Sequence, residues 1–322
     1  MTVSAPVAGG KVSRPKMIAV GGICATSVFR VPHVPHVPAK VIADTMVRLV
    51  DGMAVSAAYA FVRLGGTAAV WGRIGDDDAG RTMRAALAAE GLDTSGVIAV
   101  PGGRSSAATV IVDGQGRRLV VPFHDPSLAC SPAALPLAEL DTADIVHCDA
   151  RWPDGAEHAL RAARDRGIPT MLDGDVAPPG IIGRLLPLAD YAVFSDAGIL
   201  SHTGETDVRR ALAVVARSHP GHVGASCGAD GYVWLEGDSF QSVPAPRVEV
   251  VDTLAAGDVF HGAFALAIVE RRPIPEAAAF ACTAASLKCR RFGGWTGCPT
   301  RSEVEAAGAA PATSAAPGHD AR

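Results

Sequence analysis

The chain has 322 residues, 48% of them hydrophobic and 19% charged, which is typical of a folded protein with one large domain or two smaller ones. Its 29 Lys and Arg residues against 33 Asp and Glu residues give a net charge of −4, which excludes a nucleic-acid binder with a concentrated basic face. No apolar run approaches the roughly 18 residues of a membrane span, and the seven scattered cysteines contain no CxxC pair, so we expect a reduced, cytoplasmic protein without a membrane partner.

The N-terminal part of the chain predicts one buried strand and one extended segment. Residues 1–16 lack the apolar stretch of a signal peptide and are expected to form a flexible leader. Residues 17–23 (MIAVGGI) predict a buried strand that ends in a tight turn. In residues 28–40 (VFRVPHVPHVPAK) three prolines forbid a helix and favour an extended edge segment. Strand geometry would place His33 and His36 on opposite faces, which argues against a shared metal ion.

The next segments alternate between helix and strand. Residues 53–64 are small and apolar, which predicts a buried helix, and a glycine pair follows it. Residues 68–74 predict a strand and residues 81–90 a second helix. Three acidic residues at 76–78 precede that helix; a cation site is the alternative, but acids at a helix start more often cap it and favour its dipole.

Two alternating segments, 107–112 and 117–121, flank Asp113-Gly114 and predict a β-hairpin. From residue 145 onward, short apolar strands alternate with helical segments. Repeated βα units of this kind predict a mostly parallel sheet covered by helices.

The predicted organisation is therefore one α/β domain over residues 17–305, with a mostly parallel sheet flanked by helices. A small β-sheet lid would be built from residues 28–50 and 107–122. The Ala/Pro/Ser-rich residues 306–322 predict a disordered tail.

The turn DTLAAGD, residues 252–258, carries the strongest chemical signal in the chain. It follows a predicted strand at 248–251 and opens a predicted helix, and ligands of open α/β sheets bind at such strand ends. The small residues at 255–257 let backbone amides approach an anion closely. Asp258 beside them suits phosphoryl transfer to a hydroxyl, with a base on the nucleophile and amides on the transferred group. The alternative is that Asp258 only caps the helix.

This turn resembles the DTxGAGD signature of the ribokinase-like, or PfkB-type, carbohydrate kinases. The similarity runs from about residue 17 to residue 300 and includes MIAVGG and RLGGTAAVWGRIGDDDAG. The resemblance implies that Asp258 is the catalytic base and that Ala255, Ala256 and Gly257 form the anion hole. It also implies a sugar substrate, ATP and Mg²⁺, a homodimer assembled through the lid, and it leaves open a monovalent cation such as K⁺.

Within the family the chain resembles the 6-deoxy-6-sulfofructose kinases, on the blocks CDARWPDGA, MLDGD, FSDAG, GDVFHGA and SLKCRRFGG. In that subgroup the arginine of the RW element would hold the sulfonate, a role that falls to Arg151. A guanidinium fork suits bidentate contact with a sulfonate or phosphate. The alternative is an Arg151 that stacks on Trp152 or pairs with Asp154.

The chain departs from the family pattern on the sugar side. Thr26 stands where the family usually has an Asp, Asp51-Gly52 replaces a glycine pair, and Ser56 replaces an Asn. These positions are the implied substrate-binding residues. Exchanging a carboxylate for the Thr26 hydroxyl removes a charge-assisted hydrogen bond of about 1.5–3 kcal/mol, which points to a different substrate or a weakened site.

The nucleotide side departs as well. Ala255 replaces the usual glycine, which we expect to be tolerable only if its φ is not positive. The family's NxxE motif, which helps to place magnesium, reads Ser195-Asp196-Ala197-Gly198, so that Asp196 is the candidate stand-in ligand. The implied ATP-binding residues are Ser195, Gly257 and, in SCGADG where the family has TLGxxG, Ser226, Gly228 and Gly231.

Two other functions compete with the kinase. The segment GASCG fits G-x-S-x-G and makes Ser226 a candidate serine nucleophile, but a strand-like segment follows instead of the helix that a hydrolase needs. A sugar-binding relative without turnover is favoured by Thr26, Ala255 and Gly198 and opposed by Asp258. Neither a GxGxxG fingerprint nor a P-loop is present.

The preferred hypothesis is an ATP- and magnesium-dependent kinase for a primary hydroxyl of a ketose or related sugar, with 6-deoxy-6-sulfofructose as the leading candidate. Fructose, a sugar phosphate, 2-keto-3-deoxygluconate or a nucleoside remain as alternative substrates.

Overall fold

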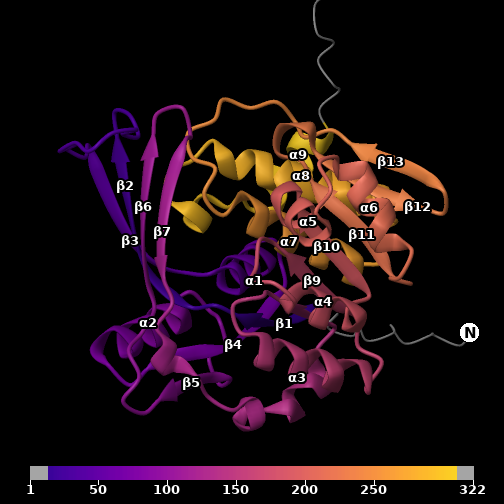
Figure 1. The fold of residues 1–322 in the computed structure, drawn as a ribbon, viewed down its shortest axis with the longest axis horizontal. Helices are drawn as coiled ribbons and strands as arrows, with labels where there is room; N and C mark the ends of the chain where they lie inside the picture. The colour runs from indigo at the N-terminus through magenta and orange to yellow at the C-terminus, as the bar shows by residue number, and fades with distance from the viewer. Residues whose placement is uncertain (1–13, 310–322) are drawn as a thin grey trace, which may run out of the picture.

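The computed structural model describes residues 14–309 and is built around a nine-stranded sheet of order β13-β12-β11-β10-β9-β8-β1-β4-β5 (Figure 1). From β11 to β5 every neighbouring pair is parallel, and only the pairs β11–β12 and β12–β13 are antiparallel. The carboxyl ends of the parallel strands therefore share one edge, where the loops of the site emerge. The strands are β1 (Lys16–Gly21), β4 (Thr67–Gly75), β5 (Val97–Val100), β8 (Ile145–Cys148), β9 (Thr170–Gly174), β10 (Tyr191–Ser195), β11 (His222–Ser226), β12 (Tyr232–Glu236) and β13 (Ser239–Val243).

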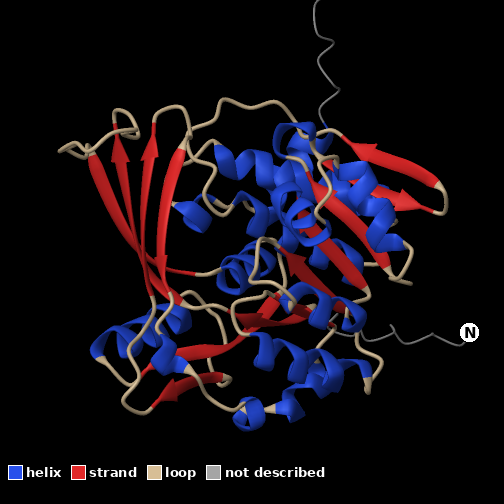
Figure 2. Cartoon of the chain, in the orientation of Figure 1, coloured by secondary structure: helices blue, strands red, loops and turns tan. Residues whose placement is uncertain are grey.

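Helices cover both faces of this sheet, as Figure 2 shows. In β1, Met17 and Ala19 pack into one buried cluster with α1, α7 and α8, whereas Ile18 and Val20 pack into a second cluster with α3, α4 and α6. This alternation explains why the strand is apolar throughout and confirms the predicted α/β architecture. The helices are α1 (Met53–Arg63), α2 (Asp78–Ala89), α3 (Pro153–Arg164), α4 (Ile181–Leu185), α5 (Asp196–Thr203), α6 (Val208–Ala216), α7 (Ala256–Val269), α8 (Ile274–Cys289) and α9 (Arg301–Ala309).

A separate four-stranded sheet of order β3-β2-β6-β7 stands at one end of the body and forms the lid (Figure 1). Its strands are β2 (Cys24–Val31), β3 (Thr45–Asp51), β6 (Ala107–Asp113) and β7 (Arg118–Phe123). Val28, Val110 and Val112 are buried on its inner face. The buried carboxylate of Asp113 accepts hydrogen bonds from Gln115 and Arg117, which fixes the predicted hairpin turn.

Three boundaries differ from the sequence prediction. Strand β2 ends at Val31, and residues 32–44 form an irregular loop, because the prolines end the strand instead of extending it as an edge. His33 and His36 lie in that loop. Lys16 belongs to β1 and not to the predicted leader. Helix α9 continues to Ala309, so residues 306–309 are helical and do not belong to the predicted tail.

The remaining parts of the predicted leader and tail, 1–13 and 310–322, lie outside the described residues. At the start of α2 the Asp77 side chain accepts a hydrogen bond from the Gly80 amide, which confirms the capping interpretation of the acidic residues there. Between residues 14 and 309, no helix has the length and hydropathy to cross a membrane.

Candidate active site

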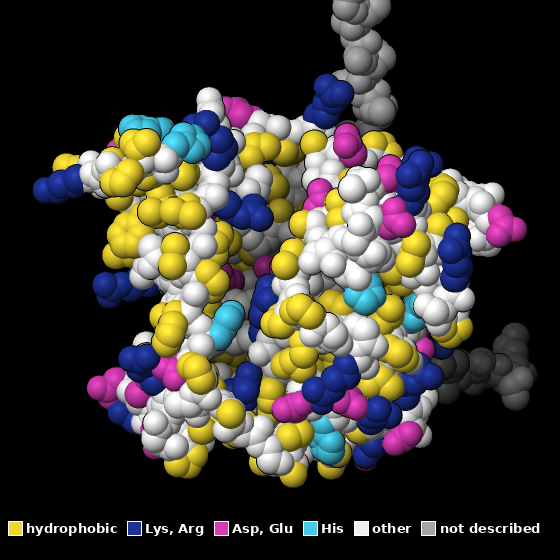
Figure 3. All heavy atoms as spheres, in the orientation of Figure 1, with side chains coloured by type: hydrophobic (Ala, Val, Ile, Leu, Met, Phe, Trp, Pro, Cys, Tyr) yellow, Lys and Arg dark blue, Asp and Glu magenta, His cyan; other side chains and the backbone are white. Residues whose placement is uncertain are grey.

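A cavity of about 430 Å³ lies between the strand ends, the start of α7 and the inner face of the lid. Figure 3 shows it as a hollow between the lid and the body, with acidic and basic side chains inside. Most of the predicted site residues line it: Thr26, Asp51, Gly52, Arg151, Ser195, Ser226, Ala255, Ala256, Gly257 and Asp258. Ser56, Asp196, Gly228 and Gly231 do not.

The start of α7 is arranged to receive an anion. Ala255 is the N-cap residue and makes no side-chain cap, so the helix start relies on backbone groups. Apart from the Ala256 amide, which lies 3.2 Å from the carbonyl oxygen of Thr253, the first amides make no backbone hydrogen bond. Asp258 is the third helical residue and not the cap, so the alternative that it only caps α7 is wrong.

Ala255 has a φ of 60° and a ψ of 13°, which places it in the left-handed region. Our expectation that alanine requires a negative φ there is therefore wrong. An L-residue in this conformation costs about 1–2 kcal/mol, and the surrounding packing holds it in place. The backbone thus keeps the shape of a glycine turn although a methyl group has replaced the glycine hydrogen.

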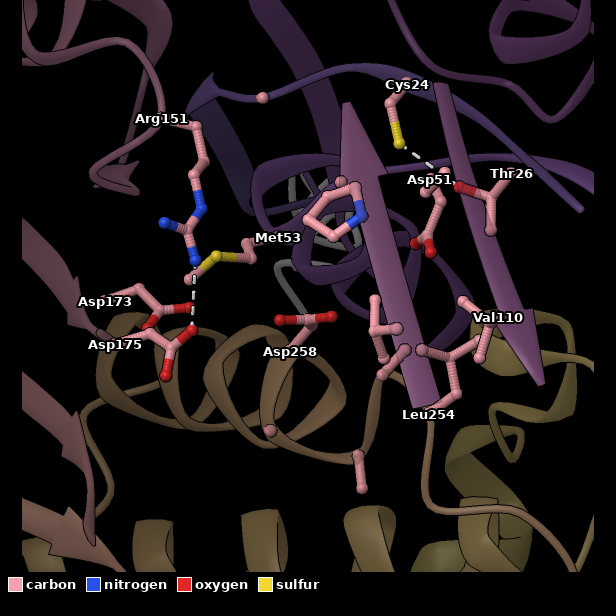
Figure 4. A pocket seen from close by; sticks show the side chains of 18 of the residues that line it. Cys24, Thr26, Asp51, Met53, Val110, Arg151, Asp173, Asp175, Leu254 and Asp258 are labelled. Atoms are coloured by element: carbon pink, nitrogen blue, oxygen red, sulfur yellow. Dashed lines mark hydrogen bonds and ion pairs between the residues drawn. The ribbon is translucent and has the colours of Figure 1, made fainter. Parts of the chain in front are cut away.

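Asp258 rises from α7 into the cavity, as Figure 4 shows. Desolvation raises the pKa of its carboxyl well above the usual value, and the negative charges of Asp173 and Asp51 raise it further, while His261 partly opposes them. A carboxylate with a raised pKa is a stronger base than a free aspartate. The electrostatics therefore suit removal of a proton from a hydroxyl.

On the sugar side, Asp51 is oriented by Ser56. The Ser56 hydroxyl donates a hydrogen bond of 2.7 Å to Asp51 Oδ1 and is itself fully buried on α1, so Ser56 reaches the cavity only through Asp51. Gly52 has a φ of 134°, and a Cβ there would lie 2.0 Å from the carbonyl oxygen of Gly22. Only glycine lets the lid and the first strand approach this closely.

Arg151 lies at the cavity wall after β8, with its guanidinium directed toward Asp175 (Figure 4). Arg151 Nη2 is 3.2 Å from Asp175 Oδ2, and Nη1 donates to the carbonyl oxygen of Val176 at 3.0 Å. Both alternatives for this side chain are wrong. Arg73 is the side chain that lies over the Trp152 ring, 5.1 Å from its centroid, and Arg184 pairs with Asp154 at 2.7 Å.

Asp149 is a structural residue that the sequence analysis missed. Its carboxylate is fully buried and accepts backbone hydrogen bonds from Gly22 at 3.0 Å, Ala54 at 3.0 Å and Arg151 at 2.7 Å. It therefore ties together the ends of β1 and β8 and the start of α1. The available signal was an acid directly after the buried run IVHC.

On the nucleotide side, Asp173 and Asp175 at the end of β9 were also missed, although both line the cavity. Ser195 Oγ accepts from the Gly198 amide and donates to Asp175 Oδ1 at 2.9 Å. A Cβ at Gly198 would lie 1.9 Å from the carbonyl oxygen of Gly174, so no acid fits there. Asp196 is exposed on α5, and its carboxylate accepts from the neighbouring amide of Ala197.

The segment around Ser226 is a strand-turn-strand. Ser226 is the last residue of β11, a short 3₁₀ turn follows at Gly228–Asp230, and β12 returns antiparallel. Gly228 and Gly231 have φ values of 55° and 91° and shape this turn. A serine hydrolase would require a strand-to-helix elbow at the serine, and this geometry excludes one.

The comparison with known proteins decides the family. The model of the pfkB family carbohydrate kinases matches residues 16–301. The chain belongs to this family. A Bacillus subtilis ribokinase is 28% identical over 256 residues, which are 79% of this chain and 86% of the relative, and a Vibrio alginolyticus fructokinase is 26% identical over 81% of this chain and 92% of its own length.

Solved structures of related kinases agree with the fold. A putative ribokinase from Agrobacterium tumefaciens is 39% identical, with a TM-score of 0.85 over 92% of this chain and 97% of its own. An Arabidopsis thaliana ribokinase solved with ribose and ATP has a TM-score of 0.76 at 24% identity, over 93% of this chain and 100% of its own. This kinase is therefore a carbohydrate kinase with the ribokinase fold. These relatives are named for two different sugars, ribose and fructose.

Proposed function

We propose that this kinase transfers the γ-phosphate of ATP to a primary hydroxyl of a ketose that carries an anionic group, with 6-deoxy-6-sulfofructose as the leading candidate. The observation that carries the proposal is that one cavity holds both a negatively charged side chain that can act as a base and a positively charged side chain that can bind an anion. Asp258 is a basic carboxylate at an anion-binding helix start, and Arg151 is a guanidinium on the same cavity's wall.

In the proposed mechanism Asp258 removes the proton of the sugar hydroxyl as the oxygen attacks the γ-phosphorus in line, while the bond from that phosphorus to the β-phosphate oxygen breaks and ADP leaves. The backbone amides at 255–257 bind the charge that develops on the transferred group. The lid excludes water that would otherwise hydrolyse ATP. Arg118 on β7 supports closure, because its guanidinium donates to the carbonyl oxygen of Thr253 at 3.1 Å, directly beside the anion hole.

The oxygen-rich side of the cavity fits magnesium bound together with a nucleotide. Within residues 14–309 no group of three or more His, Cys, Asp or Glu side chains is arranged to hold an ion by itself. Mg²⁺ commonly uses one or two carboxylates plus substrate phosphates and water. We therefore assign Asp175 and Asp173, in place of the exposed Asp196, as the carboxylates that would hold Mg²⁺. The ion would neutralise phosphate charge. Ser195, Ser226 and the Gly257 amide would contact the nucleotide, with Gly228 and Gly231 shaping the turn beside it.

The preference for an anionic sugar follows from the charges on the sugar side. On the lid side, Thr26 supplies a hydroxyl where the family usually has an Asp, and the carboxylate stands at Asp51 instead. An anionic group next to Arg151 could form charge-assisted hydrogen bonds with a guanidinium that Asp175 already orients. A ribose-like substrate has no such group, so it would gain nothing from Arg151.

The outer face of the lid supports a homodimer. It exposes large apolar side chains, from Met46 at 42% to Val121 at 55%, together with Leu119 and Phe123. A contiguous apolar face of this kind is a typical protein interface, and a second copy of the lid is its proposed partner. A cytoplasmic location belongs to the same proposal, because the seven cysteines are scattered and contain no CxxC pair.

The test is a mass-spectrometric search for a phosphorylated product. The protein would be incubated with MgATP and sulfofructose, fructose, fructose 6-phosphate, 2-keto-3-deoxygluconate, ribose or adenosine, with the Asp258→Asn variant as control. A product from sulfofructose or a sugar phosphate, but not from neutral sugars, would support the assignment of Arg151. A product only from neutral sugars would overturn that assignment, and thermal stabilisation by a sugar without any product would indicate a binding protein without turnover.

A further inference from the structure

Lys288, on the last turn of α8, is one of four lysines in the chain and is fully buried. Its ammonium donates a hydrogen bond of 2.7 Å to the backbone carbonyl oxygen of Asp252 and lies 3.3 Å from Asp252 Oδ2. Lysine is almost never fully buried unless it is paired, because an ammonium loses its hydration there. The kinase mechanism proposed above does not use this side chain.

The partner of Lys288 is the first residue of the DTLAAGD turn. Asp252 Oδ1 accepts from the Leu254 amide at 2.8 Å, and Oδ2 accepts from the amides of Gly293 and Gly294 at 2.9 and 3.0 Å. The Val251 and Asp252 amides both donate to the carbonyl oxygen of Cys289. Asp252 and Lys288 therefore fasten the loop that enters the anion hole to the end of α8.

The ammonium also balances charge at a sensitive place. Asp252 is completely buried and lies three residues before Ala255, the start of the anion hole. An unneutralised carboxylate there would repel the phosphate groups that the neighbouring amides must bind. Some cation is thus required behind the anion hole, and either a lysine or a bound ion could provide it.

We propose that Lys288 is a built-in cation that replaces a bound monovalent ion, so that this kinase works without K⁺. The inference rests on the proposed function. Potassium is bound in proteins by carbonyl and other oxygen ligands. The carbonyl oxygen and the carboxylate of Asp252 are oxygen ligands of this kind, and both already contact the ammonium. A potassium ion therefore does not fit at Asp252 while Lys288 is present, and Lys288 acts as a positioning residue.

The first experiment uses the unmodified protein. Rates of sugar phosphorylation would be compared in KCl, NaCl and choline chloride at equal ionic strength and saturating MgATP. We expect rates within about twofold of one another. A several-fold activation by K⁺ over choline would overturn the proposal.

The second experiment compares Lys288→Met with the matched control Lys16→Met. Methionine keeps the apolar stem of Lys288 and removes only the ammonium, whereas Lys16 contacts Thr142 away from the cavity. We expect Lys288→Met to lose about 10–100-fold in kcat and to regain most of it in KCl or NH₄Cl but not in choline chloride. A folded variant with the same activity in every salt would contradict the role of Lys288.

A thermal-unfolding readout separates this inference from the proposed function. The melting temperature of Lys288→Met should rise in KCl relative to choline chloride, while the parent protein and Lys16→Met should show no such difference. This measurement needs no turnover. If no sugar is phosphorylated in any salt, the proposed function fails, and the melting temperatures still test Lys288. If the variant does not fold in any salt, the salt comparison on the parent protein decides.

Discussion

Two buried aspartates hold the two halves of the cavity, and they do so with different partners. Asp149 fixes the sugar half by accepting three backbone N–H groups, and the positive charge that acts on it comes from Arg151 at the cavity wall. Asp252 fixes the phosphate half by accepting three backbone N–H groups and, in addition, the ammonium of Lys288. Asp149 and Asp252 are thus held by the same number of backbone N–H groups, but only Asp252 is paired with a buried ammonium.

This difference follows from what each half must bind. Burial raises the pKa of the Asp149 carboxyl, and its N–H partners together with the charge of Arg151 only partly offset that effect. In the sugar half, the sugar hydroxyls donate hydrogen bonds and Arg151 supplies a positive charge, so a residual negative charge on Asp149 is tolerated there. Beside an anion hole the same charge would oppose the nucleotide, and there the ammonium cancels it. We therefore expect substitutions in the phosphate half to lower kcat and substitutions in the sugar half to raise the KM for sugar.

The largest effect is expected from Asp258→Asn in the phosphate half. The amide retains the shape but removes the base, so kcat should fall by about 10²–10⁴-fold. The KM for sugar should change little, because the contacts of the sugar half remain. Steady-state kinetics with circular dichroism as a folding check would measure this. An equal loss in kcat and in sugar affinity would show that the two halves are not separable.

The same variant tests the raised pKa of Asp258. A carboxyl whose pKa is higher in the folded than in the unfolded state binds extra protons when folded, so its contribution to stability is lost as the pH rises above the unfolded value. The melting temperature of Asp258→Asn relative to the parent protein should therefore increase from about pH 5 to about pH 8. A constant difference across this range would mean that the pKa is not raised.

In the sugar half, Asp149→Ala should reduce stability by about 2–4 kcal/mol, because it leaves three inward-facing backbone N–H groups without acceptors. Asp149→Asn keeps one acceptor oxygen and should lose less. Urea unfolding would measure both. In each variant that folds, the KM for sugar should rise more than kcat falls, since Gly22, Ala54 and Arg151 belong to the sugar side. Unchanged stability in the alanine variant would contradict the role of Asp149.

Arg151→Met tests the anionic specificity of the same half. Loss of charge-assisted hydrogen bonds should lower kcat/KM for an anionic ketose by about 10–100-fold. The value for fructose should stay nearly constant. Arg184→Met is the matched control, since Arg184 pairs with Asp154 and Glu157 outside the cavity. An equal loss for charged and neutral sugars would assign Arg151 a structural role only.

The sequence predicted the phosphate half better than the sugar half, and the reason is locality. The strand-loop-helix at DTLAAGD lies within one short segment, so composition and spacing were enough to identify Asp258 and its anion hole. Asp149 acts on Gly22 across 127 residues, and Lys288 acts on Asp252 across 36, so neither role is visible before the chain folds. The same limit hid Asp175, whose relation to Gly198 exists only where β9 and β10 pair.

The smallest effect concerns Ala255, the strained residue at the start of α7. Alanine propensity argues against a positive φ at Ala255, yet tertiary contacts impose 60° there. Ala255→Gly should relieve about 1–2 kcal/mol of backbone strain in the folded state. Glycine also gives the unfolded chain more conformational freedom, which cancels about half of that stabilisation, so the free energy of unfolding should rise only slightly. Arg271→Gly is a matched control, because Arg271 has a φ of 61° at the end of α7, away from the cavity.

Both variants should become slightly more stable in urea unfolding, and only Ala255→Gly should alter kcat, because only that residue shapes the anion hole. If Ala255→Gly lowered kcat while Arg271→Gly had no effect, the strained alanine would be holding the amides in place. If neither variant gained stability, the strain at both positions would already be offset by their packing.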